Sequence, residues 1–166
     1  QIMKVVRGDL LKLALAGRFD VIVHGCNCGN AMGAGIALAI RKEFPEAYRA
    51  DGNTPKWDRS KMGSISHATV KRGNSHEITV VNGYTQYHWK GRGTAGDGET
   101  TLVDYEALRS VMRLVKVRFR GQKMRIGYPR IGAGLAGGDW TIIAQIIDEE
   151  LEGEDHTLVE YSRGTD

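Results

Sequence analysis

The stretch VIVHGCNCGNAMGAGIALAI, residues 21–40, decides the fold of this chain. The segment from Asp20 to Val23 is a nearly continuous apolar run, which predicts a short strand covered on both faces. A polar, glycine-rich segment from Gly25 to Gly35 follows it and leads into a predicted helix over Ile36–Phe44, which Pro45 ends. The same order of strand, glycine loop and helix occurs a second time in the chain.

The second copy begins with a predicted strand at Met124–Tyr128 and continues through a glycine loop at Gly132–Gly138. A helix from Asp139 or Trp140 to about Leu151 follows. A loop after a strand exposes backbone N–H groups, and the next helix adds its own free N–H groups and the positive end of its dipole. Glycine also lets the backbone approach a phosphate without a Cβ in the way. Two such loops at the ends of neighbouring strands can hold a diphosphate between them.

Two other interpretations of the loops are open at this stage. Gly33, Gly35, Gly132 and Gly134 could make tight turns and nothing more. Residues 132–137 also match the dinucleotide fingerprint G-x-G-x-x-G, which belongs in the first strand–helix–strand unit of a nicotinamide-binding domain. Too few residues remain after position 137 for the rest of such a domain, so we reject a dehydrogenase.

The rest of the chain also alternates between strand and helix patterns. We expect strands at 2–6, 65–70, 77–81 and 157–161, helices opening at 8–11 and spanning 100–120, and loops at 51–62 and 90–99. No repeat, linker or domain break is visible. The sequence therefore predicts one domain over residues 1–166, an α/β protein with a three-layer α/β/α sandwich around a mixed, mainly parallel sheet.

Composition fits an ordinary globular domain. The chain has 166 residues, 41% hydrophobic and 26% charged, and no apolar run approaches the roughly 18 residues of a membrane span. Cys26 and Cys28 are too close for an ordinary disulfide, which favours reduced thiols and a cytoplasmic location. With His24 they would form a crowded zinc site without an obvious fourth ligand, so we expect no metal and no cofactor.

The net charge of +3 is unevenly spread. Basic residues gather between Arg113 and Arg125, and acidic residues between Asp148 and Asp155. A basic cluster can bind nucleic acid. A solvated helix end, where the dipole favours cations, is the simpler interpretation. We therefore expect no nucleic-acid partner and no membrane, and we expect a monomer.

Four segments together resemble the macrodomain family: Gly8–Leu11, Val21–Asn27, Met32–Ala37 and Pro129–Leu135. They occur in order over nearly the whole chain. The branch they resemble holds ADP-ribose-1″-phosphate phosphatases and the terminal ADP-ribose protein glycohydrolase. The resemblance implies one macrodomain whose ligand is ADP-ribose or ADP-ribose-1″-phosphate.

The resemblance also implies roles for particular residues. Asp9 would accept a hydrogen bond from the adenine amino group beside Leu10, Tyr161 would lie against adenine, and Asn27 would bind the distal ribose. The diphosphate and distal ribose would lie between two sets of loop residues, namely Gly33, Ala34, Gly35 and Ile36, and Gly132, Ala133, Gly134 and Leu135. Asp9 could equally be a helix cap, Asn27 a turn residue and Tyr161 an ordinary strand aromatic.

The glycohydrolase relatives use a lysine and an aspartate that this chain lacks. Residues 82–86 occupy the lysine-bearing region without a lysine, and Ala136 stands where the aspartate would be. Asp139 and an early His24 match the phosphatase side of the branch instead. There Asp139 would activate the water that attacks the terminal phosphate, and His24 would stabilise charge or protonate the leaving group. The alternatives are that Asp139 caps the last helix and that His24 is a core histidine.

Three functions follow from these residues. The first is hydrolysis of ADP-ribose-1″-phosphate to ADP-ribose and phosphate. The second is removal of ADP-ribose from a modified macromolecule, and the third is binding of ADP-ribose without catalysis. All three use the same loops, so the loops cannot separate them.

Overall fold

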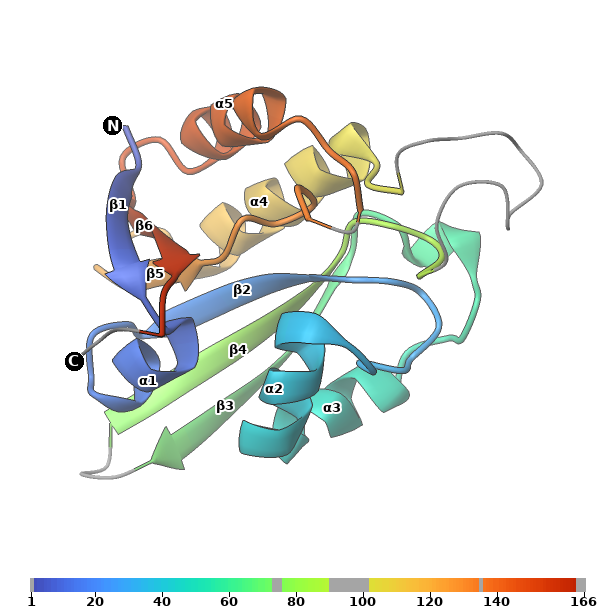
Figure 1. Ribbon diagram of the computed structural model, residues 1–166, viewed down its shortest axis with the longest axis horizontal. Helices are drawn as coiled ribbons and strands as arrows, with labels where there is room; N and C mark the ends of the chain where they lie inside the picture. The colour runs from blue at the N-terminus through green and yellow to red at the C-terminus, as the bar shows by residue number, and fades with distance from the viewer. Residues whose placement is uncertain (1, 73–75, 90–101, 135, 164–166) are drawn as a thin grey trace.

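A computed structural model describes residues 2–72, 76–89, 102–134 and 136–163, with the remaining positions drawn as a grey trace in Figure 1. Within these residues one six-stranded sheet has the order β1-β6-β5-β2-β4-β3. All neighbouring strands are parallel except β3 and β4. The strands are β1 Lys4–Gly8, β2 Val21–Cys26, β3 Ile65–Arg72, β4 His76–Tyr84, β5 Arg125–Tyr128 and β6 Asp155–Tyr161.

Helices cover both faces of the sheet (Figure 1). Helices α4 (Tyr105–Phe119) and α5 (Trp140–Glu150) pack on one face around buried residues such as Leu108 and Ile147. On the other face lie α1 (Leu10–Leu15), α2 (Gly35–Glu43) and α3 (Pro45–Gly52), around a second core that includes Ile22. The expected α/β/α sandwich with a mixed, mainly parallel sheet is therefore confirmed.

The central position of β2 follows from its sequence. Val21, Ile22 and Val23 are fully buried, with alternate side chains in the two cores. Such a strand is stable only where helices cover both of its faces. Strand β2 pairs with β4 on one side and β5 on the other, so the two glycine loops follow directly neighbouring strands, as the sequence indicated.

Several boundaries differ from the sequence prediction. The main error concerns Pro45, which ends α2 and also starts α3, because proline suits the first helical position where no N–H partner is needed. The segment 51–62, expected to be a loop, holds the end of α3 and a short 3-10 helix, η1 (Arg59–Lys61). Strand β4 extends to Tyr84, and α4 begins at Tyr105 with Asp104 as its N-cap. The expected 90–99 loop lies outside the described residues.

Two features are absent from the described residues. None of their helices is long and apolar enough to cross a membrane. The described residues also contain no group of three or more His, Cys, Asp or Glu side chains that could hold a metal ion.

Candidate functional site

A cavity of about 620 Å³ opens at the carboxyl ends of β2 and β5. Both glycine loops line it, the first through residues 33–37 and the second through Gly132 and Gly134. Pairing of β2 with β5 brings the two loops together, so that each forms a wall of one space. The loops therefore converge on one cavity, and we infer that they act on one ligand.

The first loop presents an uncapped helix N-terminus to this cavity. Helix α2 has Ala34 at its N-cap position and no side-chain hydrogen bond there. By contrast, α1, α4 and α5 are capped by Asp9, Asp104 and Asp139, whose carboxylates accept backbone N–H groups. The first N–H groups of α2 have no partner within the helix, and no carboxylate stands at its N-cap position to neutralise their positive field. An anionic ligand in the cavity would satisfy both.

Glycines leave room on both walls. A Cβ added to Gly33 or Gly134 would meet no protein atom within 4 Å. Gly132 is different, since its φ of 74° lies in the left-handed region and its Cβ would come within 2.7 Å of Val103. The Gly132 carbonyl also accepts the Gly138 N–H at 2.7 Å. Gly132 therefore fixes the shape of the second loop, while Gly33 and Gly134 keep space open for a ligand.

Asp51 is an unexpected member of the cavity wall. It comes from the last turn of α3, is 1% exposed, and lines the cavity. The Tyr84 hydroxyl donates to its Oδ1 at 2.6 Å. Burial raises the pKa of the Asp51 carboxyl, while the Tyr84 hydrogen bond and the nearby Lys61 charge oppose that rise. A buried carboxylate with raised basicity, facing a ligand cavity, is a candidate general base.

Lys61 organises the protein beside Asp51. Its Nζ donates to Asn30 Oδ1 at 2.5 Å, to Thr54 Oγ1 at 2.8 Å and to the Pro55 carbonyl at 2.8 Å. It also lies 4.5 Å from the centroid of the Tyr84 ring. Lys61 therefore connects the first glycine loop to the segment after α3 and supplies positive charge close to the cavity.

A directional chain of hydrogen bonds connects His24 to Asp51. Asn82 Nδ2 donates to the Ala47 carbonyl and to Ser66 Oγ, both at 3.0 Å. Asn82 Oδ1 must therefore accept from His24 Nε2, at 2.7 Å. The Ser66 hydroxyl lies 2.8 Å from Tyr84 Oη, which donates to Asp51. If Ser66 donates to Tyr84, every bond in the chain points from His24 toward the carboxylate.

His24 itself does not line the cavity. It is fully buried, and that burial lowers the pKa of its imidazole to about 4. His24 is thus a core histidine hydrogen-bonded to a neighbour, which was the alternative interpretation from sequence.

The buried neutral state of His24 predicts a pH dependence of stability. Unfolding returns the imidazole pKa from about 4 to 6.5, so the unfolded chain binds the proton more tightly. The free energy of unfolding is therefore unaffected by this group above pH 6.5. It decreases as the pH falls from 6.5 toward 4, by about 3 kcal/mol in total. Denaturant unfolding at several pH values should show that His24→Gln loses this part of the dependence. Parallel pH profiles for the two proteins would contradict it.

Asp139 lies outside the cavity as well. It is exposed, caps α5, and accepts the Thr141 N–H at 2.9 Å, while its own N–H donates to Tyr105 Oη. The cavity lining includes neither Asp139 nor His24. The structure therefore does not bring together, around the cavity, the pair expected to act on a terminal phosphate.

The residues expected at adenine follow β1 and end β6, the two strands beyond β5, at the same carboxyl end of the sheet as the cavity. Asp9 caps α1 by accepting the Leu11 and Lys12 N–H groups. Leu10 is buried, and Tyr161 is 71% exposed at the end of β6. Gly8 and Tyr161 are partners in the β1–β6 register, so Asp9 and Tyr161 belong to the same end of these two strands. None of the three lines the cavity, and their contact with adenine stays a prediction.

Among the expected ribose and diphosphate residues, Asn27 does line the cavity. Its Oδ1 accepts the Gly29 N–H at 2.8 Å, which is the turn-stabilising role considered from sequence. The cavity lining also includes the expected Ala34, Gly35 and Ile36, but not Ala133. Leu135 lies outside the described residues.

Ten lining residues had no binding or catalytic role assigned from sequence. They are Gly25, Cys26, Ala31, Met32, Ala37, Asp51, Gln86, Trp89, Leu102 and Ala136. Gln86 occupies the region where the family resemblance places a lysine, and its Nε2 donates to the His88 carbonyl at 2.8 Å. Ala136 occupies the expected place of the aspartate. Cys26 is not an activated thiol, since burial raises its pKa well above the usual range.

Two glycine loops around one cavity, at the carboxyl ends of parallel strands, define an α/β domain of the nucleotide-binding kind. Comparison with known proteins gives the family. The model of the Macro domain matches residues 23–147, and the chain belongs to this family.

Individual relatives agree with that assignment. An uncharacterized 17.5 kDa protein of Enterobacteria phage T4 is 36% identical over 151 residues, which cover 89% of this chain and 88% of that protein. A DNA ADP-ribosyl glycohydrolase of Thermus aquaticus is 28% identical over 90% of this chain, and the match spans 38% of the glycohydrolase. An ADP-ribose 1″-phosphate phosphatase of Lodderomyces elongisporus is 40% identical, over only 28% of this chain and 30% of the phosphatase.

Solved structures support the fold. A protein of unknown function from Bacteroides thetaiotaomicron matches with a TM-score of 0.71 and 26% identity, covering 96% of this chain and 99% of that one.

Proposed function

We propose that this macrodomain binds ADP-ribose in the cavity between its glycine loops and hydrolyses the bond that joins ADP-ribose to a macromolecule. The observation that carries the proposal is the Asp51 carboxylate on the wall of a cavity lined by both loops. In this arrangement the diphosphate lies between the two loops, and the reacting ribose lies beside a base.

Diphosphate binding rests on the backbone. The uncapped N–H groups at the start of α2 face the cavity, and Gly33 and Gly134 leave space on its two walls. A diphosphate brings the negative charge that the helix terminus lacks. Asn27, at the same end of β2, would then donate from Nδ2 to a hydroxyl of the distal ribose.

The proposed chemistry uses Asp51. With the diphosphate between the loops, we place the distal ribose beside Asp51, which lines the same cavity. Asp51 takes a proton from water as the water oxygen bonds to C1″ of the ribose. The bond from C1″ to the macromolecule breaks, its electron pair stays with the departing atom, and that atom takes a proton from solvent. Lys61 holds the neighbouring loop, and Tyr84 orients the carboxylate.

Two considerations favour glycohydrolysis over the phosphatase reaction expected first. The match to the Thermus aquaticus DNA ADP-ribosyl glycohydrolase covers most of this chain, whereas the phosphatase match covers 28% of it. In addition, Asp139 and His24, the residues on which the phosphatase assignment rested, do not line the cavity. The missing lysine counted against glycohydrolysis. In this proposal Asp51 supplies the catalytic group in its place.

The reaction is tested by offering three substrates to the purified protein. They are an ADP-ribosylated DNA oligonucleotide, an ADP-ribosylated peptide and ADP-ribose-1″-phosphate. The proposal predicts release of free ADP-ribose from at least one conjugate and no phosphate from the third substrate. Phosphate release would favour the phosphatase, and tight ADP-ribose binding without any turnover would favour a reader. Either result would overturn the proposal.

A further inference from the structure

A cluster of aromatic side chains stands at the edge of the cavity and has no role in the reaction described above. We call Trp57, Tyr87, His88 and Trp89 the aromatic platform. Trp57 lies between α3 and η1, and the other three follow β4. Trp89 lines the cavity and is 47% exposed. A large apolar ring held half open to solvent beside a ligand cavity suggests a surface for part of the ligand.

The platform is tightly packed. The ring centroids of Trp57 and His88 are 4.9 Å apart with planes inclined by 23°, and Trp89 lies 4.9 Å from Trp57 and 5.0 Å from His88. The Tyr87 hydroxyl donates to the Trp57 carbonyl at 2.7 Å. A ring supported on two sides loses little entropy when a ligand stacks on it.

The backbone accommodates this packing at two places. A Cβ at Gly29 would lie 2.5 Å from Trp89 and 2.6 Å from Trp57, so only glycine lets the rings approach the first loop. Trp57 has φ of 57°, in the left-handed region that bulky residues rarely adopt. Such strain clusters at ligand sites, which is consistent with a functional position for the rings.

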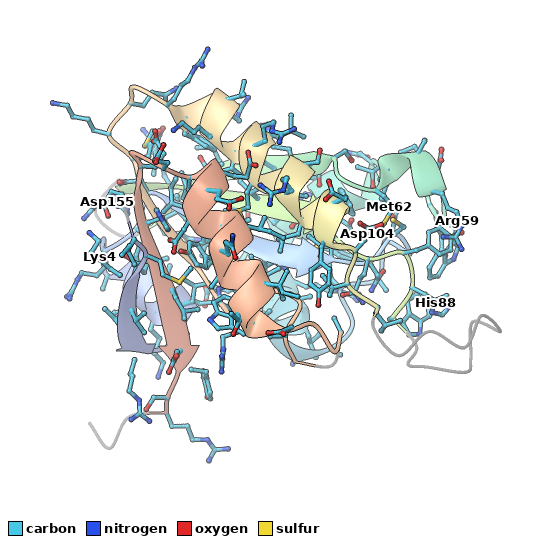
Figure 2. The ribbon with its side chains drawn as sticks, turned by 90° about the horizontal axis from the view of Figure 1, so that it is seen from above. Lys4, Arg59, Met62, His88, Asp104 and Asp155 are labelled. Carbon is cyan, nitrogen blue, oxygen red and sulfur yellow. The ribbon has the colours of Figure 1, made fainter. Side chains whose placement is uncertain are left out.

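Positive charge accompanies the rings. The Arg59 guanidinium lies 3.9 Å from the centroid of the Tyr87 ring, and Lys56 and Arg59 are both exposed. Asp58 lies between them in the sequence, and its carboxylate accepts the Ser60 N–H as the N-cap of η1. Figure 2 shows Arg59 and His88 at the same end of the molecule, near Met62. A flat aromatic face with a neighbouring cation suits a nucleobase and its phosphate.

We propose that the platform binds the acceptor side of the substrate and that this acceptor is a single-stranded nucleic acid, with a base stacked on Trp89. The inference rests on the proposed function, because Trp89 lines the same cavity as Asp51, beside which C1″ would carry the macromolecule. Every base offers a π face to such a ring, whereas a modified carboxylate or hydroxyl side chain of a protein offers none. The basic cluster of α4, considered from sequence, has no part in this site.

Binding to single-stranded DNA that carries ADP-ribose on one base tests the proposal. The measurement uses Asp51→Asn, so that the conjugate survives, and compares Trp89 with Trp89→Ala and Trp89→Phe. We expect Trp89→Ala to weaken oligonucleotide binding by about tenfold or more, in the range that replacement of base-stacking aromatics gives. The loss for an ADP-ribosylated peptide should be at least several-fold smaller. Trp89→Phe should recover most of the affinity.

A spectroscopic readout separates stacking from support of the fold. The fluorescence of Trp89, obtained as the difference between the Asp51→Asn protein and its Trp89→Phe variant, should be quenched by the DNA conjugate more than by the peptide conjugate. Equal losses of affinity for both conjugates, or equal quenching, would overturn the stacking proposal. These measurements need no turnover, so they stay informative if the protein hydrolyses neither conjugate.

Discussion

Replacing Gly33 with glutamate is expected to weaken ADP-ribose binding strongly while the protein stays folded. The new side chain would have room, since nothing lies within 4 Å of a Cβ at this position. Its carboxylate would stand before the uncapped N-terminus of α2, where negative charge stabilises a helix. The same carboxylate would repel the diphosphate. Because like-charge juxtaposition costs several kcal/mol, affinity should fall by about 100-fold or more.

Calorimetry with ADP-ribose and thermal unfolding check this prediction together. Gly52→Glu is the matched control, since Gly52 also has open space around its Cβ and does not line the cavity. The two variants should unfold at similar temperatures and differ strongly in affinity. If Gly33→Glu binds ADP-ribose as tightly as the wild-type protein, the first loop does not hold the diphosphate.

The second large effect is expected from Asp51→Asn. Asparagine keeps an oxygen that can accept from Tyr84, so the local structure should survive. It cannot take a proton from water, and turnover should fall by about 100- to 10,000-fold, as for loss of a general base. Affinity for ADP-ribose should fall far less. Asp58→Asn, at an exposed position where asparagine is also a good N-cap, is the control and should retain activity.

The pH dependence of the reaction follows from the raised pKa of Asp51. The base is active when deprotonated, so the rate should decline on the acidic side, at a pH higher than an ordinary aspartate would give. The residual activity of Asp51→Asn should lack that decline. Single-turnover rates measured from acidic to neutral pH would show both. If wild-type and variant have the same acidic limb, another group acts as the base.

Local patterns were sufficient to predict the elements that build the site. Residues 21–44 and 124–151 each carry a buried strand, a glycine loop and a helix in close succession, and pairing of β2 with β5 then brings the loops together. Asp9 and Asp139 were ambiguous for a physical reason. An aspartate before a helix is an N-cap with or without a ligand nearby, and both are N-caps in the structure.

The chemistry-bearing residues could not be predicted because long-range packing places them. Asp51 lies on α3, a helix that was missed because Pro45 was interpreted only as a stop signal. Nothing in its neighbourhood along the chain shows that Tyr84, 33 positions away, will hold it at the cavity. Trp57 and Trp89 likewise meet only through tertiary packing. His24 was singled out from its position in a motif, and the structure connects it to Asp51 through three intervening side chains.

The crystal structure of the complex with ADP-ribose tests the central claim most directly. We predict diphosphate oxygens within hydrogen-bond distance of backbone N–H groups in both glycine loops, with C1″ of the distal ribose turned toward the Asp51 carboxylate. A diphosphate bound away from either loop, or a distal ribose on the opposite side of the cavity from Asp51, would contradict it.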